Sequence, residues 1–279
     1  MRDLSITSLP PHLLLEVTAR CNYHCPFCYC VWNEIPSLGS EDLDTAAWEE
    51  ILRDCTKRGV RELVFTGGEA TLRADIWRLL EVARELLPQG TVSLFTNGST
   101  MTEERLLWCK ERKVYLSTSL QGLRTYGKHT GTRRSCKRVL SLLARASELE
   151  WPMDVSITVS RINSKEAVDL FAAATLSHAR SIQMGAVMVE GRCRKRLDLP
   201  LTPAEWETLK AQIRALPNGQ SVGFADEMLC ACRKQPLDLL ASYGETSMGN
   251  CTAGKEFGVI GPTGLFRKCL HTVETFAWR

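Results

Sequence analysis

The chain has 279 residues, 44% of them hydrophobic and 24% charged, which is typical of a globular protein with a substantial buried core. Its 35 basic and 32 acidic residues are interspersed and give a formal net charge of +3, so the sequence offers no broad basic field for nucleic acid. The first residues do not resemble a secretory signal, and no apolar run is long enough to span a bilayer. We therefore expect a cytoplasmic protein with neither a membrane nor nucleic acid as its partner.

Strand-like apolar runs alternate with helical patterns as far as residue 190. HLLLEVT at residues 12–18 predicts the first strand, and residues 45–59 predict a helix that ends at Gly59. Five further strands are predicted, each separated from the next by a helical segment: ELVFTGG, TVSLFTNG, KVYLSTSL, MDVSITVS and SIQMGAVMV. This order favours parallel pairing through right-handed crossovers and a sheet covered on both faces. We predict an α/β fold whose six units form an open, partial (β/α)6 TIM-like barrel.

The pattern changes after residue 190. A polar, Pro-containing segment is followed by a helical pattern, PAEWETLKAQIRAL, and then by Gly-rich sequence with further cysteines. GVIGPTGLFRKC predicts a β-hairpin with its turn at Pro-Thr-Gly. We expect a barrel over residues 1–190, a linker and helical segment over residues 191–250, and a small hairpin-containing unit over residues 251–279.

The chain has 12 cysteines, which is many for a cytoplasmic protein. A reducing compartment keeps thiols free, so metal ligation is the leading explanation for cysteines that are clustered. Cys55, Cys109 and Cys136 instead lie within helical patterns, and we interpret them as small apolar side chains. We assign no catalytic role to the isolated residues His129, His178 and His271.

Four cysteines fall within ten residues, CNYHCPFCYC, directly after the first predicted strand. Cys21, Cys25 and Cys28 have the spacing C-x3-C-x2-C, and three thiolates on one loop can hold three irons of a four-iron cluster while the fourth iron stays open. Zinc is the alternative, but it normally needs a second pair of ligands, and His24 is poorly placed to provide one. A fourth protein ligand would close the open iron, so we interpret Cys30 as a neighbour of the cluster.

With Phe27 before its last cysteine, this motif resembles the C-x3-C-x-aromatic-C signature of the radical S-adenosylmethionine (radical SAM) enzymes. The resemblance covers about residues 10–190. It implies a [4Fe–4S] cluster whose open iron binds S-adenosylmethionine (SAM) through its amino and carboxylate groups. It also implies reductive cleavage of SAM to methionine and a 5′-deoxyadenosyl radical, which abstracts a substrate hydrogen. The electron would come from an external donor such as flavodoxin or ferredoxin.

FTGGEAT at residues 65–71 resembles the GGE segment of the family, and the resemblance implies that Gly67, Gly68 and Glu69 contact the amino group of SAM. Two glycines permit close approach of the backbone to a ligand, and a carboxylate offers acceptors to an ammonium group.

LFTNGS and STSLQG resemble the third-strand and fourth-strand segments of the family, which implies that Asn97 and Ser119 contact SAM, Ser119 at the ribose or carboxylate. Two positions depart from the family pattern: Gln121 stands where Asp is usual, and Thr130 stands where Arg is common. The cysteines, the GGE segment, Asn97 and Ser119 all fall at carboxyl ends of predicted strands. Parallel barrels place their active sites at these ends.

CTAGKEFGVIGPTGLFRKC at residues 251–269 resembles the opening of the SPASM or twitch extension of radical SAM enzymes, with its C-x-A-G, hairpin and G-x4-C elements. The resemblance implies an auxiliary iron–sulfur cluster. We expect one such cluster, held by Cys251 and Cys269 with one or both of Cys230 and Cys232, and Cys193 is a further candidate. Alternatively, these cysteines are packing residues or the extension is degenerate.

The C-T-A-G and S-L-x-G segments are most similar to those of radical SAM enzymes that modify peptides or proteins, such as peptide maturases and anaerobic sulfatase-maturating enzymes. We therefore expect modification of a peptide or protein side chain. The alternatives are a dehydrogenase or epimerase of a sugar, aminoglycoside or nucleotide-derived substrate, and a non-enzymatic iron–sulfur or zinc protein. Only about eleven residues precede the first strand, so we expect no N-terminal leader-binding domain.

Overall fold

The computed structural model describes residues 9–225 and 251–277. Within these ranges, nine strands form one sheet in the order β7-β6-β5-β4-β3-β2-β1-β8-β9. The strands β1 to β7 run parallel to their neighbours, as predicted from the alternating pattern. Their bounds are β1 (His12–Glu16), β2 (Glu62–Thr66), β3 (Thr91–Thr96), β4 (Val114–Ser119), β5 (Asp154–Val159), β6 (Ser181–Ala186), β7 (Gly223–Ala225), β8 (Phe257–Ile260) and β9 (Phe266–Arg267).

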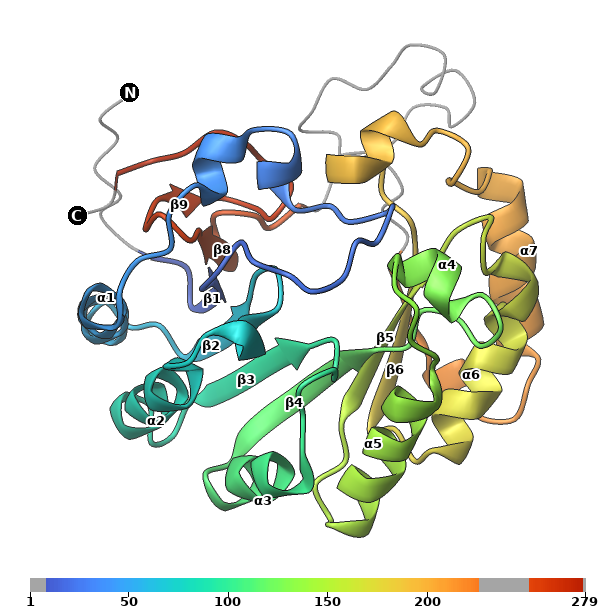
Figure 1. Ribbon diagram of the computed structural model, residues 1–279, viewed down its shortest axis with the longest axis horizontal. Coiled ribbons are helices and arrows are strands. Elements are labelled where there is room, and N and C mark those ends of the chain that lie inside the picture. Colours follow the sequence, from blue (N-terminus) through green and yellow to red (C-terminus); the bar gives the residue numbers. More distant parts are fainter. Residues whose placement is uncertain (1–8, 226–250, 278–279) are drawn as a thin grey trace.

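Apart from α4 (Tyr126–Thr130), which lies at the end of the strands, the helices lie along the outer side of the curved sheet (Figure 1). They are α1 (Thr45–Lys57), α2 (Ile76–Leu86), α3 (Glu103–Glu111), α5 (Lys137–Glu148), α6 (Ala167–Leu176) and α7 (Pro203–Arg214). Local sequence fixes several helix starts: Asp44 accepts a hydrogen bond from the Ala47 N–H at α1, and Thr202 and Glu205 form a capping box at α7. The prediction of a partial barrel built from β/α units is confirmed.

The two faces of the sheet differ in polarity. Val155 and Ile157 of β5 are buried, whereas Ser156 between them is exposed, and Gln183 is exposed beside buried Met184 in β6. The expectation of a sheet covered on both faces is therefore wrong for these strands. Their side chains alternate between a helix-covered outer face and a polar interior of the barrel, as the period-two pattern of MDVSITVS indicates.

The C-terminal segment completes the sheet on the far side of β1. β8 pairs in parallel with β1, and β9 folds back antiparallel to β8, so the predicted hairpin is confirmed. The apolar outer side of the strands packs with the helices into one continuous core, which includes Trp48, Leu79 and Leu143.

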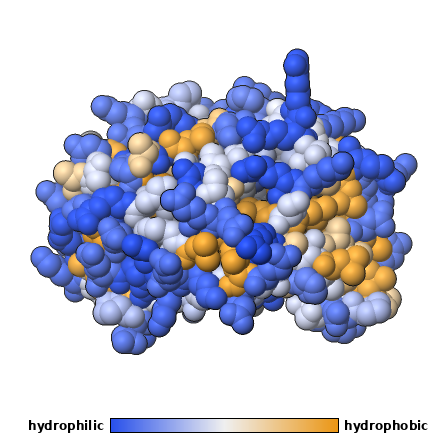
Figure 2. All heavy atoms as spheres, turned by 60° about the horizontal axis from the view of Figure 1, so that its bottom comes forward, coloured by the Kyte–Doolittle hydropathy of each residue, from blue (hydrophilic) through white to orange (hydrophobic). Residues whose placement is uncertain are grey.

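The surface seen from the side of α2, α3 and α5 is mainly hydrophilic, with apolar residues gathered in smaller areas (Figure 2). In the described part of the chain, no helix is both long enough and apolar enough to cross a membrane.

Candidate active site

A cavity of about 530 Å³ opens at the carboxyl ends of the parallel strands. Its lining comes from the loop after β1, from the ends of β2 to β6, and from the more distant residues Arg192 and His271. The structure brings together in this cavity all eight residues that the sequence predicted for the main site: Cys21, Cys25, Cys28, Gly67, Gly68, Glu69, Asn97 and Ser119.

The three predicted ligand thiols lie on one loop, residues 20–30, which we call the cysteine loop. The Tyr23 N–H points at the Cys21 sulfur, with 3.4 Å between nitrogen and sulfur, and the Asn33 side-chain amide donates to Cys28 Sγ at the same distance. Such donors favour the thiolate form of a cysteine. Cys25 Sγ lies 3.6 Å from the Thr130 carbonyl oxygen.

Burial and neighbouring charges act differently on the thiols. Burial raises the pKa of Cys21, and it raises the pKa of Cys25 to about 12. A hydrogen bond with Cys30 lowers the pKa of Cys28 to about 6. The Arg192 guanidinium lowers the pKa of all three thiols, although it is not the largest cause for any of them. A bound metal cluster would hold these sulfurs as thiolates.

Two glycines with positive φ clamp the cysteine loop. Gly131 (φ 65°) follows α4, and a Cβ there would lie 2.4 Å from the His24 carbonyl oxygen. Gly191 (φ 57°) opens the 3-10 helix η5 (Gly191–Lys195), and a Cβ there would lie 2.3 Å from the Cys28 carbonyl oxygen. The Arg192 N–H donates to the same Cys28 oxygen at 2.9 Å, so two distant segments fix both halves of the loop.

The donor set fits a four-iron cluster with one open iron. Four cysteines of one loop line the cavity, but Cys30 is buried and engaged with Cys28 and the Gly67 carbonyl oxygen, which leaves Cys21, Cys25 and Cys28 as the candidate ligands. Within residues 9–225 and 251–277, no three His, Cys, Asp or Glu side chains form a site for a single metal ion.

The GG pair of the GGE segment packs against the protein's own backbone. A Cβ at Gly67 (φ 128°) would lie 2.4 Å from the Thr18 carbonyl oxygen, and one at Gly68 would lie 2.3 Å from the Arg20 carbonyl oxygen. The Gly68 and Glu69 N–H groups donate to these same two oxygens, each at 2.8 Å. The glycines therefore join the end of β2 closely to the start of the cysteine loop.

Glu69 is buried and held by four donors. Its Oε1 accepts hydrogen bonds from the Thr71 N–H and hydroxyl and from Thr96 Oγ1, the last at 2.6 Å, and its Oε2 accepts from the Asn97 N–H at 2.6 Å. These bonds fix the carboxylate in one orientation at the edge of the cavity.

Asn22 does not line the cavity but supports the residues that do, and sequence reasoning missed it. Its side chain accepts a hydrogen bond from Asn97 Nδ2 and donates one to Ser99 Oγ, both at 2.9 Å, and so ties the cysteine loop to the end of β3. The only sequence signal was a polar residue directly after the first ligand cysteine.

The two departures from the family pattern have structural partners. The Gln121 side-chain oxygen accepts a hydrogen bond from the Thr158 N–H at 2.9 Å, which joins the ends of β4 and β5. The Thr130 hydroxyl donates a hydrogen bond to the Tyr126 carbonyl oxygen at 2.7 Å. The Thr130 carbonyl oxygen accepts a hydrogen bond from the His24 N–H at 3.1 Å.

Arg192 is the second missed residue. It brings a guanidinium to a cavity wall that otherwise consists largely of neutral side chains. Its Nη1 lies 3.4 Å from the Cys25 carbonyl oxygen. In the sequence it belongs to the basic run GRCRKR, which we assigned to the linker rather than to the site.

Cys251 and Cys269, the described members of the second cysteine group, do not line this cavity. Cys251 is exposed and Cys269 is partly buried, and a Cβ at Gly254 would lie 2.9 Å from the Lys268 side chain, so the segments that carry them are side by side. Cys230 and Cys232 lie outside the described residues.

The remaining cysteines are packing residues where the structure describes them. Cys193 is buried with Val187 and Leu199 in a small apolar cluster. Cys55, Cys109 and Cys136 are buried in the main core, so their assignment to packing is confirmed.

His271 is the part of the C-terminal segment that reaches the cavity. Its Nδ1 lies 3.5 Å from Cys269 Sγ, and its ring meets the Tyr29 ring edge-on with centroids 5.3 Å apart. The segment that carries Cys269 therefore touches the cysteine loop directly.

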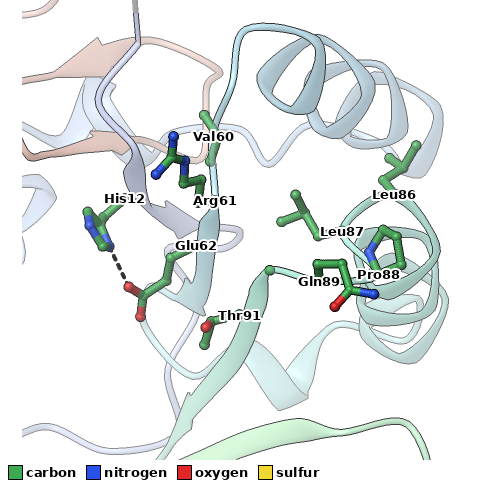
Figure 3. Close-up of a pocket in the computed structure, with 10 residues that line it drawn as sticks. His12, Val60, Arg61, Glu62, Leu86, Leu87, Pro88, Gln89 and Thr91 are labelled. Atoms are coloured by element: carbon green, nitrogen blue, oxygen red, sulfur yellow. Dashed lines mark hydrogen bonds and ion pairs between the residues drawn. The ribbon is translucent and has the colours of Figure 1, made fainter.

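A second hollow of about 490 Å³ lies at the opposite, amino ends of β1 to β3 (Figure 3). His12 and Glu62 face each other there, with 2.5 Å between His12 Nδ1 and Glu62 Oε2. None of the predicted site residues lines this hollow.

Comparison with known proteins gives a family match and several relatives. The model of the Radical SAM superfamily matches residues 15–174. The sporulation killing factor maturation protein SkfB of Bacillus subtilis strain 168 is 27% identical over 199 residues, 68% of this chain and 47% of that protein. A PqqA peptide cyclase of Rhodopseudomonas palustris is 27% identical over 273 residues, 96% of this chain and 68% of that protein.

Among solved structures, the crystal structure of Streptococcus suis SuiB bound to its precursor peptide SuiA has a TM-score of 0.74 and 18% identity. The match covers 97% of this chain and 62% of SuiB, and it supports the barrel fold. The chain thus spans about half the length of SkfB and less than two thirds of SuiB.

Proposed function

We propose that this chain, which belongs to the radical SAM superfamily, holds a [4Fe–4S] cluster on Cys21, Cys25 and Cys28 and cleaves SAM reductively. The observation that carries the proposal is the gathering of these three thiols, the GGE segment and the ends of β3 and β4 around one cavity. When bound, the cluster supplies the electron that breaks a carbon–sulfur bond of SAM, which gives methionine and a 5′-deoxyadenosyl radical.

The protein's own groups would bind and orient SAM. Glu69 offers carboxylate oxygens to the amino group, and its four hydrogen bonds keep it from turning away. Ser119 and Asn97 line the same cavity and offer hydroxyl and amide groups. Arg192 offers its guanidinium to the carboxylate of SAM, because planar N–H donors match a carboxylate well.

We further propose that the substrate is a peptide or protein side chain. The names of three relatives point this way, since SkfB is a maturation protein, PqqA cyclase acts on a peptide and SuiB binds a precursor peptide. The cavity also supports it. Ser156 and Gln183 offer neutral hydrogen-bonding groups suited to peptide amides, and Phe95, 43% exposed, offers an apolar surface.

The C-terminal unit over residues 251–279 is proposed as a twitch-like extension that holds one auxiliary cluster. Cys251 and Cys269 would be its ligands, with one or both of Cys230 and Cys232. The adjacency of the Gly254 and Lys268 segments and the exposure of Cys251 support this assignment.

The test is anaerobic reconstitution with iron and sulfide, an iron count, and assay of 5′-deoxyadenosine after addition of SAM and dithionite. We expect about eight irons per chain and formation of 5′-deoxyadenosine. Cys25→Ala should abolish SAM cleavage, whereas Cys109→Ala, a buried cysteine of the core, should not. Full activity of Cys25→Ala would refute the cluster assignment.

A double variant tests the auxiliary cluster separately. Cys251→Ala/Cys269→Ala should lower the iron count by about four per chain, which corresponds to one four-iron cluster. An unchanged iron count in this variant would remove the auxiliary cluster from the proposal.

A further inference from the structure

We propose that a group of exposed basic side chains beside the cysteine loop is the docking surface for a small, acidic electron-transfer protein. This basic rim consists of Lys128, Arg133, Arg134 and Lys195, all of them exposed. The inference rests on the proposed function, because it assigns the rim to delivery of the electron that SAM cleavage needs.

Positive charge is concentrated in two short segments of a chain whose total charge is nearly balanced. Residues 128–134 contain three basic residues and no acidic one, and residues 192–198 contain four basic residues and one acidic one. By contrast, the whole chain has 35 basic and 32 acidic residues. A local excess of one sign attracts partners of the opposite sign and speeds their association.

The two segments are those that clamp the cysteine loop. Gly131 lies against the His24 carbonyl oxygen. Gly191 lies against the Cys28 carbonyl oxygen, to which the Arg192 N–H also donates a hydrogen bond. The cysteine loop, blue in Figure 1, reaches toward α4, from which the first segment continues. The second segment approaches the first at Asp198, whose pKa is lowered mainly by Arg196 and also by the charge of Lys128.

Other basic residues of this region are already paired. Arg124 bonds Glu166, and Arg196 bonds Asp198. Arg194 contacts two carboxylates, those of Glu34 and Glu190. Within residues 9–225 and 251–277, the four rim residues have no carboxylate partner within ion-pair distance. Their charge is therefore available to a partner.

The position of the rim favours an electron donor over the substrate. None of the four rim residues lines the cavity, so the charges that would hold the donor are separate from the groups that would face SAM and substrate. His24 is exposed, and Gly131 of the first basic segment packs against its backbone, so a donor docked on that segment would lie next to the loop that carries Cys25. In the transfer, the reduced donor loses one electron and the cluster gains it, and no atom moves.

The experiment compares two charge-reversed holoenzymes with the wild type. The rim variant is Lys128→Glu/Arg133→Glu/Arg134→Glu/Lys195→Glu. The control reverses four exposed basic residues next to the amino ends of β2, β4 and β8, at the other end of the barrel: Lys57→Glu/Arg61→Glu/Lys113→Glu/Lys255→Glu. Both variants change the net charge equally, so a difference in their flavodoxin binding or activity comes from where on the surface the charges lie.

The first measurement is binding of a flavodoxin of net negative charge, by fluorescence anisotropy at low and high salt. We expect at least tenfold weaker binding to the rim variant, little change for the control, and weakening of wild-type binding by salt. Equal binding by the rim variant and the wild type would overturn the inference. So would unchanged flavodoxin binding accompanied by lost binding of a poly-glutamate peptide, which would assign the rim to an acidic peptide.

The second measurement is the rate of 5′-deoxyadenosine formation with two reductants. Reduced flavodoxin should drive the rim variant at least tenfold more slowly than the wild type, while dithionite should drive both at the same rate. Equal losses with both reductants would show damage to the site and overturn the docking role. Wild-type holoenzyme that forms no 5′-deoxyadenosine even with dithionite would defeat the proposed function, and the binding measurement would still decide the docking surface.

Discussion

His129 packs against Phe27, the aromatic residue before the last of the three predicted ligand cysteines. Its ring packs on Phe27 with centroids 4.3 Å apart, its Nδ1–H donates to the Gln121 carbonyl oxygen, and its Nε2 accepts from the Ser160 hydroxyl. Burial lowers the pKa of His129 to about 4, so the ring is neutral at physiological pH. Phe27 therefore rests on a fixed, uncharged platform, which holds the cysteine loop in place.

Arg192 is the residue whose replacement tests how SAM is held. We expect Arg192→Met to weaken SAM binding to the reconstituted protein about tenfold or more, because it removes a charge-assisted hydrogen bond but keeps the backbone bond to Cys28. Equilibrium dialysis with labelled SAM measures the effect, and Arg58→Met, directly after α1, serves as the control. Unchanged SAM affinity together with a lowered iron content would assign Arg192 to support of the cysteine loop instead.

At the scale of elements, the cysteine loop is held by loops rather than by its own strand. The segments after α4 and at the start of η5 approach it through Gly131 and Gly191, and the end of β2 approaches it through Gly67 and Gly68. Each approach is too close for a Cβ atom, so these four glycines set the shape of the loop that carries the three predicted ligands.

Gly191→Ala should loosen this clamp. The substitution combines an unfavourable positive φ with a Cβ placed 2.3 Å from the Cys28 carbonyl oxygen, so the backbone must shift. Gly59→Ala is the matched control, because Gly59 also has a positive φ (84°) but no atom within 4 Å of the added Cβ. Two quantities are measured: the iron that each variant retains after gel filtration, and its free energy of unfolding in urea.

We expect Gly59→Ala to cost about 1–2 kcal/mol of unfolding free energy and to keep its iron. Gly191→Ala should cost about 1–3 kcal/mol more and lose iron during gel filtration. If the two variants behave alike, the close contact with the cysteine loop does not support the ligands.

At the scale of the whole molecule, a buried ion pair joins the C-terminal hairpin to the first strand. Arg267 of β9 donates to Glu16 of β1, and both side chains are at most 2% exposed. Arg267 also donates to the carbonyl oxygens of Leu270 and Thr272, on either side of His271. The pair thus holds the segment that reaches the cavity against the barrel.

Arg267→Met should destabilise the protein by about 3–5 kcal/mol near pH 8.5, because it leaves a buried carboxylate without its partner. Burial raises the pKa of Glu16 to about 7 even beside Arg267, and loss of the guanidinium raises it further. At pH 6, well below this pKa, Glu16 is mostly protonated in both folded proteins, so the variant's loss of unfolding free energy is smaller there and grows as the pH rises above 7.

Urea unfolding of both proteins at pH 6 and pH 8.5 measures this pH dependence. Glu16→Gln/Arg267→Met should recover part of the lost stability, because it removes the unpaired carboxylate as well. A deficit that does not depend on pH would mean that the lost hydrogen bonds to Leu270 and Thr272, rather than the charge of Glu16, cause the destabilisation.

The sequence by itself determined the elements and the chemistry. The order of the first six strands and their helices, the hairpin at residues 251–269, and the candidate site residues among the cysteines and at the strand ends were predicted from local periodicity and short motifs, whereas the short strand β7 was not predicted. Such signals are readable because the side chains that make them are neighbours along the chain.

Only the tertiary structure decided which distant groups support the site. Asn22 meets Asn97, Cys28 meets Gly191 and Arg192, and Glu16 meets a partner 251 positions away. These contacts depend on how loops from different strands lie in space, and no local pattern encodes that placement, because each loop is fixed by the others that pack against it.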